Sequence, residues 1–266
     1  MRRFCLGLAI ALSVGGGGQA AFAQASDPRV ADIVRAGELR VGLGLGVLMQ
    51  AVKNPTTGEL RGAALDLARA LASRIGVKLI IVEYPRPGAV IDGLSNNAWD
   101  VSFLTFDPAR KEQVDFSHTF LTSDMTYLVA PGSHIRSIAD ADQIGVRIAT
   151  PRGDSSDLYL SRTLKRAELV RTDSHAAALD LVRTGKADAK ASARFVLLNE
   201  ASAVPGSRVL DDGFADILYA AIVPKGQAAR LAYLNEFLEG AKASGLIKRI
   251  IETLELQGVK VAPAEE

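Results

Sequence analysis

Short apolar runs alternate along the chain with stretches whose apolar residues recur at helical spacing. One such stretch covers residues 64–75 and is followed by Gly76, a residue that suits the left-handed end of a helix. A buried-strand pattern comes next, at residues 78–82. This alternation predicts an α/β protein with a mainly parallel sheet. Further strands are predicted at residues 101–104, 127–130, 147–150 and 219–223, further helices at 228–242 and 246–256, and a loose tail from residue 259.

Arg110 is the first candidate for binding chemistry. It lies on a short turn just after the apolar run 101–104. A guanidinium presents its donors in a planar fork that matches a carboxylate, and the exit of a buried strand is where α/β proteins hold ligands. The alternative is a surface arginine in a basic loop with Lys111, and spacing alone does not separate the two interpretations.

A second candidate lies at residues 150–156, where a strand pattern changes into a helical one. The free N–H groups and the positive dipole end of a helix N-terminus favour an anion. Ser155 is the first choice for such a contact. The alternative is structural, because Asp154 or Ser155 is also an ordinary residue to cap a helix.

The N-terminus has the features of a secretory signal. Arg2 and Arg3 precede an apolar stretch at residues 6–14, and small residues follow as far as residue 25. Residues 1–25 are therefore predicted to be a signal peptide that is cleaved from an exported, periplasmic protein. Cys5 is the only cysteine and would leave with this segment, so no disulfide or thiolate chemistry is expected in the mature chain.

Charge adds little to this picture. The chain has 31 basic and 30 acidic side chains, and its formal net charge is +1. Such a balance argues against nucleic acid or an anionic membrane as the partner. The 48% hydrophobic content supplies enough apolar surface for one large domain or two lobes.

The segment around Arg110 also carries a resemblance. Residues 105–117 read T-x-x-P-x-R-(x)4-D-F-S, which resembles the T-x-T-P-E-R-K-x-x-V-D-F-S signature of the family 3 extracellular solute-binding proteins. These proteins are the receptors of ATP-driven uptake systems for amino acids and other small polar solutes. Similar motifs follow in the family's order over residues 37–256, at positions 39–42, 58–68, 146–155, 185–189 and 222–226.

The resemblance implies a two-lobed periplasmic-binding-protein fold of type II. The first lobe would comprise residues 36–129 plus 220–262, and the second residues 130–219. Two strands near residues 127–129 and 219–221 would cross between the lobes as hinges. A ligand bound between the lobes would favour the closed form. The expected partner is a membrane permease of an ABC transporter, and a monomer is expected. A sensory role would use the same site with a different partner.

The same resemblance implies the binding site. Arg110 would hold a carboxylate with help from the hydroxyl of Thr105, which could equally be an ordinary strand-end residue. Phe103 and Leu104 would offer backbone groups, and Arg152 a second positive charge in the other lobe. The full set of candidate ligand contacts is Phe103, Leu104, Thr105, Arg110, Arg152, Asp154, Ser155 and Arg194.

Departures from the family pattern narrow the ligand class. Amino-acid binders carry an acidic residue for the ligand ammonium five positions after the aspartate of G-x-x-D-A. Here Asp188 plus five is Ala193, followed by Arg194. Residues 43–52 also lack the aromatic residue that often covers the ligand. An unpaired buried ammonium is unfavourable, so we predict a small anionic solute without an essential ammonium, and a zwitterionic amino acid as second choice.

An enzyme is the less favoured alternative. Some relatives of this fold are dehydratases that act on cyclic carboxylates, and Asp107, Glu83 and Asp154 are acids that a cleft could use. No local arrangement singles out a general acid, so no catalytic residue is assigned. The three histidines, at positions 118, 134 and 175, fit no metal-binding spacing and are each expected on the surface or in a loop. No cofactor or metal is predicted.

Overall fold

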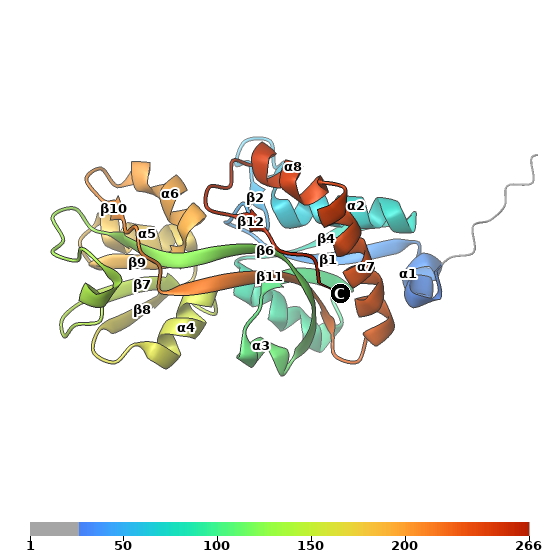
Figure 1. Ribbon diagram of the computed structural model, residues 1–266, viewed down its shortest axis with the longest axis horizontal. Helices are drawn as coiled ribbons and strands as arrows, with labels where there is room; N and C mark the ends of the chain where they lie inside the picture. The colour runs from blue at the N-terminus through green and yellow to red at the C-terminus, as the bar shows by residue number, and fades with distance from the viewer. Residues whose placement is uncertain (1–26, 266) are drawn as a thin grey trace, which may run out of the picture.

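The computed structural model describes residues 27–265, so the predicted signal peptide lies outside the described residues. The molecule is elongated and has two lobes (Figure 1). The helical segments are η1 (Pro28–Val30), α1 (Ala31–Ala36), α2 (Ala63–Ile75), η2 (Pro87–Asn96), α3 (Pro108–Lys111), η3 (Ile138–Asp140), α4 (Ser155–Thr163), α5 (His175–Arg183), α6 (Arg194–Glu200), η4 (Ala201–Ala203), α7 (Ala228–Ala243) and α8 (Leu246–Thr253). The strands are β1 (Glu38–Gly44), β2 (Val52–Lys53), β3 (Leu60–Arg61), β4 (Lys78–Tyr84), β5 (Val101–Thr105), β6 (Val114–Val129), β7 (Arg147–Pro151), β8 (Glu168–Thr172), β9 (Ala189–Ala193), β10 (Arg208–Val209), β11 (Ala215–Pro224) and β12 (Lys260–Val261).

The predicted α/β architecture is confirmed. The helix predicted before residue 78 is α2, and it ends as expected at Gly76, whose φ of 82° is left-handed. β5 is buried along its whole length, which explains why its sequence is an apolar run rather than an alternating one. The turn after β5 leads directly into α3, so the strand delivers Thr105 and Arg110 to the same edge of the sheet.

Two long strands connect the lobes. The sheet order is β4-β1-β5-β11-β6-β9-β7-β8, in which the outer strands of each lobe run parallel and β6 and β11 run antiparallel to their neighbours. β6 pairs with β11 up to Met125 and with β9 from Met125 onward. Figure 1 shows β6 and β11 lying side by side between the lobes. The change of partner marks Met125 as the crossing point of β6.

The pairing of β11 with its neighbours bears on the second expected hinge, at residues 219–221. Residues 219–221 of β11 pair with residues 103–105 of β5, so they lie inside the sheet of the first lobe. The beginning of β11 lies closer to the crossing, because Ala215 pairs with Met125. Residues 127–129, where the other crossing is expected, pair with β9.

Each lobe has its own hydrophobic core. The larger cluster includes Leu39, Leu71 and Phe237 and lies between the first sheet and α2, α7 and α8. A separate cluster in the second lobe includes Ile148 and Leu160. Phe195 and Val196, from the beginning of α6, pack into the larger cluster, so the second lobe is seated against the first.

The C-terminal segment differs from the prediction of a loose tail. Lys260 and Val261 form β12, which pairs with Thr122 and Leu121 of β6. The N–H of Ala262 then donates to the carbonyl oxygen of Phe120 at 3.1 Å. Because only two residues pair, the strand has no sequence pattern of its own, and it is the exposed edge of β6 that orders it.

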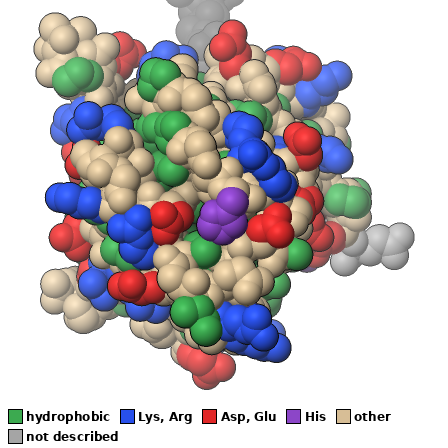
Figure 2. Space-filling model, turned by 90° about the vertical axis from the view of Figure 1, so that its left-hand side faces the viewer, with side chains coloured by type: hydrophobic (Ala, Val, Ile, Leu, Met, Phe, Trp, Pro, Cys, Tyr) green, Lys and Arg blue, Asp and Glu red, His purple; other side chains and the backbone are tan. Residues whose placement is uncertain are grey.

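Figure 2 shows the end of the molecule that the second lobe forms, where basic and acidic side chains are interspersed. Within residues 27–265 we find no helix with the length and apolar character needed to cross a membrane.

Candidate functional site

A cavity lies between the two lobes, where β5 and α3 of the first face α4 and α5 of the second. Its volume is about 40 Å³. In this closed arrangement the cavity therefore fits only a small molecule. The lining residues are Val47, Met49, Gln50, Pro87, Phe103, Leu104, Thr105, Arg110, Phe120, Asp154, Ser155, Ser156, His175, Ser192, Ala193, Phe195, Val196, Ile217 and Tyr219.

Arg110 is a buried cavity residue and not a surface arginine. It is only 4% exposed, whereas its neighbour Lys111 is exposed. The carboxylate of Asp107 begins the short helix α3 by accepting a hydrogen bond from the N–H of Ala109 at 2.8 Å. Nη1 of Arg110 donates to the carbonyl oxygen of Thr105 at 2.9 Å and also to the Thr105 hydroxyl. The end of β5 therefore fixes the orientation of the guanidinium.

The electrostatic surroundings of Arg110 suit an anion. Burial lowers the pKa of the guanidinium, while the carboxylates of Asp154 and Asp107 act in the opposite direction. An arginine remains protonated under such conditions, because its ordinary pKa is above about 12. A buried, permanently charged guanidinium gains most from a partner of opposite charge.

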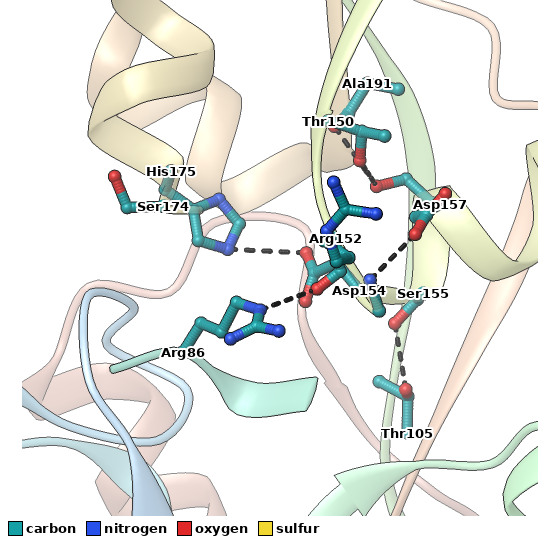
Figure 3. Close-up of polar contacts among 12 residues, drawn as sticks. Arg86, Thr105, Thr150, Arg152, Asp154, Ser155, Asp157, Ser174, His175 and Ala191 are labelled. Carbon is teal, nitrogen blue, oxygen red and sulfur yellow. Dashed lines mark hydrogen bonds and ion pairs between the residues drawn. The ribbon is translucent and has the colours of Figure 1, made fainter. Parts of the chain in front are cut away.

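The hydroxyl of Thr105 meets the second lobe. Its Oγ1 lies 2.8 Å from Oγ of Ser155, and Figure 3 shows the two side chains pointing at each other. Nη2 of Arg110 also crosses the cleft and donates to the carbonyl oxygen of Gly153 at 2.7 Å. The structure thus brings together three of the residues that the resemblance pointed to: Thr105, Arg110 and Ser155.

The floor of the cavity next to Arg110 is apolar. Phe103 and Leu104 of β5 are both buried there, and the Phe103 ring packs edge-on against Phe120 with 5.9 Å between ring centroids. The carbonyl oxygen of Phe103 accepts a hydrogen bond of 2.6 Å from Nε2 of Gln50. Gln50 in turn accepts from the N–H of Gly44 at 2.7 Å, so it ties the early loop to β5. No sequence pattern singles out Gln50, since it lies in an irregular aliphatic segment.

Asp154 does not act as an ordinary helix cap. It is the N-cap residue of α4, but its side chain makes no capping hydrogen bond. The carboxylate of Asp157 binds the loop before α4 instead, since it accepts a hydrogen bond from the N–H of Gly153 at 2.7 Å. The carboxylate of Asp154 is therefore left to face the cavity, where Oδ2 lies 3.3 Å from Nε2 of His175 (Figure 3).

His175 is a buried cavity residue, so its expected place on the surface or in a loop is wrong. It is 5% exposed and is the first residue of α5. Neither ring nitrogen has a hydrogen-bond partner among the described residues, although Nε2 is close to Asp154. Sequence spacing could not find it, because the residues that face it are distant in the chain.

Asp154 is ionised despite its burial. Burial by itself would raise the pKa of the carboxyl group, but the neighbouring His175, Arg110 and Lys190 outweigh this effect and hold the pKa below its ordinary value. Lys190 lies behind His175, where its Nζ donates to the carbonyl oxygen of His175 at 3.1 Å and to Oε1 of Glu200 at 2.7 Å. The second-lobe wall therefore holds His175 and Lys190 between two acidic side chains, Asp154 and Glu200.

Two predicted contacts do not reach the cavity. The side chain of Arg152 is exposed, and its residue contributes only a carbonyl oxygen that accepts from Nε of Arg86 at 2.9 Å. Arg194 is bound to Asp124 of β6 at 2.9 Å and donates to the carbonyl oxygen of Leu210 at 2.6 Å. Its side chain braces the crossing strand, and it is the preceding residue, Ala193, that lines the cavity.

The lobes meet in a closed arrangement. At the rim of the cleft, Nη2 of Arg162 lies 2.9 Å from Oδ2 of Asp107 in the other lobe. Gly88 of η2 lies against Gly153 so closely that a Cβ atom at residue 88 would be 2.5 Å from the carbonyl oxygen of Gly153. These contacts exist only while the cleft is shut. Across residues 27–265 no group of three or more His, Cys, Asp or Glu side chains is arranged to hold a metal ion.

Comparison with known proteins agrees with this geometry. Residues 47–254 match the model of the bacterial extracellular solute-binding proteins, family 3. The chain belongs to this family. The resemblance inferred from the segment around Arg110 is therefore confirmed, as is the two-lobed fold that came with it.

Several relatives carry names that bear on function. The chain is 26% identical over 218 residues to the ABC transporter glutamine-binding protein GlnH of Bacillus subtilis (strain 168), covering 80% of this chain and 78% of the relative. It is 25% identical over 239 residues to cyclohexadienyl dehydratase of Pseudomonas aeruginosa, covering 86% and 87%. Its fold matches the crystal structure of an ancestral amino-acid-binding protein, AncCDT-1, a precursor of cyclohexadienyl dehydratase, with a TM-score of 0.75, 28% identity and coverage of 85% and 98%.

Proposed function

We propose that this family member is a periplasmic receptor of an ABC uptake system, and that it binds a small carboxylate-bearing anion between its lobes. The observation that carries the proposal is the buried guanidinium of Arg110 in the cleft, opposite the N-terminus of α4. The transport role is supported by the family and by the glutamine-binding relative. The ligand contacts in this proposal are Phe103, Leu104, Thr105, Arg110, Asp154 and Ser155.

A ligand without an essential ammonium group fits a cavity that offers it no free acidic partner. Asp154 is the only acidic residue among the lining residues, and its carboxylate already faces His175. Ala193 offers no charge at the position where amino-acid binders of the family have an acid. Most of the other lining side chains are apolar, which suits the hydrocarbon body of a small mono- or dicarboxylate or an aromatic acid.

The last part of the proposal is that the two lobes close on the ligand by a hinge movement. We place the crossings near Met125 in β6 and near Ala215 in β11, where the strands pass from one lobe's sheet to the other. A monomer is sufficient for this function, because one chain supplies both walls of the cavity. A ligand that contacts both walls binds the closed form better and therefore shifts the population toward it.

Isothermal titration calorimetry tests the ligand class. One panel contains pyruvate, succinate and benzoate, and the other contains the zwitterionic amino acids L-glutamine and L-alanine. Binding of at least one carboxylate, and weaker binding of the amino acids, is the expected result. Tight binding of an amino acid with all carboxylates silent would overturn the proposed ligand class and favour an amino-acid receptor, the alternative that the names of the relatives support.

A dehydratase is the second candidate, favoured by the relative with that activity and by the presence of Asp154 and His175 in the cavity. Dehydration needs a group that protonates the departing hydroxyl. The low pKa of Asp154 makes it a poor acid near neutral pH, which is why we favour a receptor. Incubation with prephenate, followed by a search for a dehydrated product, decides between the two.

A further inference from the structure

The net charge of the cavity depends on whether His175, which contacts Asp154, is protonated. Arg110 contributes one positive charge and Asp154 one negative charge, so with a neutral imidazole these two cavity charges balance. A protonated His175 adds a second positive charge. Only in that state does the cavity carry the net charge that complements a bound monoanion.

Some of the charged groups around His175 favour protonation of its imidazole, and others oppose it. Asp154 favours the imidazolium, and the negative partner of Lys190, Glu200, adds to this effect at longer range. The ammonium of Lys190, the guanidinium of Arg110 and the positive end of α5, where His175 is the first residue, oppose it. The phenol of Tyr219, also in the cavity, remains neutral because burial raises its pKa.

The arrival of an anion changes this balance. A carboxylate on Arg110 offsets the guanidinium that opposes protonation of His175 and places a second negative charge near the imidazole. Nε2 of His175 faces the carboxylate of Asp154 at 3.3 Å, whereas Nδ1 has no hydrogen-bond partner among the described residues, so Nδ1 is free to take up the second proton of an imidazolium. Binding an anion and binding a proton then help each other, because such coupling is reciprocal.

We propose that His175 is the specificity-determining residue of the cavity: it takes up a proton when a net anion binds and so supplies the charge that Asp154 would otherwise cancel. A zwitterion needs no such proton, because its own charges balance. The protonation of His175 therefore decides whether the cavity prefers an anion or a zwitterion. This inference rests on the proposed function and adds to it a group that sequence reasoning placed on the surface.

The measurement is calorimetry of the wild-type protein with the tightest-binding of pyruvate, succinate and benzoate. Titration at about pH 7.5 in HEPES and in Tris, which release different heats on ionisation, gives the number of protons taken up. Over about pH 6 to 8.5 the carboxylates stay ionised while an imidazole titrates. We expect proton uptake on binding and an affinity that falls with rising pH, by at most about tenfold per pH unit for one proton.

Two variants change this behaviour in opposite directions. His175→Gln retains a polar side chain that cannot be protonated, so it is expected to bind the anion without proton uptake and with the weak affinity of wild type at high pH. Asp154→Asn removes the cancelling charge. It is expected to bind about tenfold more tightly than wild type at about pH 8.5, also without proton uptake. A gain in affinity cannot come from misfolding. His134→Gln, at an exposed histidine, is the matched control and should behave as wild type.

The outcomes separate the two proposals. If carboxylates bind but the wild type takes up no proton, or if His175→Gln still does, the role of His175 is overturned while the receptor proposal stands. If none of the three carboxylates binds, the proposed ligand class fails and this inference fails with it. Proton uptake that is present in wild type and His134→Gln but lost in both cavity variants supports it.

Discussion

On the first-lobe wall of the cavity, the charged group is held by the end of the preceding strand, β5, whereas on the second-lobe wall the charged groups are held mainly by each other. Arg110 donates to both oxygens of Thr105 and sits on a turn capped by Asp107. Asp154 makes no cap, and His175 has no hydrogen-bond partner among the described residues. The first wall therefore presents a fixed charge, and the second presents one that can change with protonation.

Because of this difference, we expect the two walls to contribute differently to ligand binding. A rigid guanidinium fixes where the carboxylate of a ligand goes, since preorganised donors lose little freedom on binding. The second wall, which includes the N-terminus of α4, would complete the proposed site on closure of the cleft. We therefore expect substitutions on the first wall to abolish binding, those on the second to change ligand preference, and those at the rim to affect closure alone.

The largest effect is expected from Arg110→Ala. Removing a buried charged partner of a ligand carboxylate weakens binding by about 2–5 kcal/mol, which is roughly thirtyfold to several thousandfold. Calorimetry with the carboxylate panel measures the loss. Arg152→Ala, which removes an exposed arginine outside the cavity, is the matched control and should bind normally. An unchanged affinity in Arg110→Ala would remove this residue from the site.

Ala193→Asp tests the second wall. It places a carboxylate at the cavity surface, so we expect binding of the anionic panel to fall by about a hundredfold through repulsion between like charges. Binding of L-glutamine and L-alanine should improve, because the new carboxylate can pair with their ammonium group. If the preference does not move toward the amino acids, position 193 does not determine the ligand class. Circular dichroism before titration checks that the variant is folded.

Gly88→Ala acts on closure without touching the charges. Its new Cβ atom would lie 2.5 Å from the carbonyl oxygen of Gly153, so the lobes cannot close fully without a shift. A steric conflict of this kind typically costs about 1–3 kcal/mol, and we expect roughly tenfold weaker binding. Small-angle X-ray scattering with saturating ligand should show a more open molecule than wild type. Gly240→Ala, where the Cβ atom meets nothing closer than 3.9 Å, is the control.

The smallest effect is expected from Arg162→Ala. Its ion pair with Asp107 spans the cleft, but the Arg162 side chain is 47% exposed. The Asp107 side chain is only 7% exposed, but water reaches the Arg162 end of the pair and screens it, so the pair should contribute about 0–1 kcal/mol and the affinity should fall by no more than about fivefold. The wild-type affinity should approach that of the variant as salt increases, because salt screens exposed pairs. A much larger loss would mean that this rim contact carries the closed state.

Local pattern was enough to predict the elements around the site. The helical spacing before Gly76 and the apolar run of β5 come from interactions between near neighbours in the chain, which the sequence displays directly. The position of Arg110 just after a buried strand was likewise visible, and so was the family signature around it. Burial of the guanidinium was not, because spacing alone allowed a surface loop equally well.

The other side chains of the cavity were not predictable in the same way. His175 and Gln50 reach the cavity from segments far from β5 and α3 in the chain, and Arg194 is drawn away from it by Asp124. The short strand β12 was missed for a related reason, since an edge of β6 orders it.

The sequence by itself thus determined the class of fold, the family and the candidate arginine, because each is written in the spacing of neighbouring residues. Only the tertiary structure decided which side chains share the cavity with that arginine. Their approach depends on how two separately packed lobes close on each other, and no local pattern records that packing.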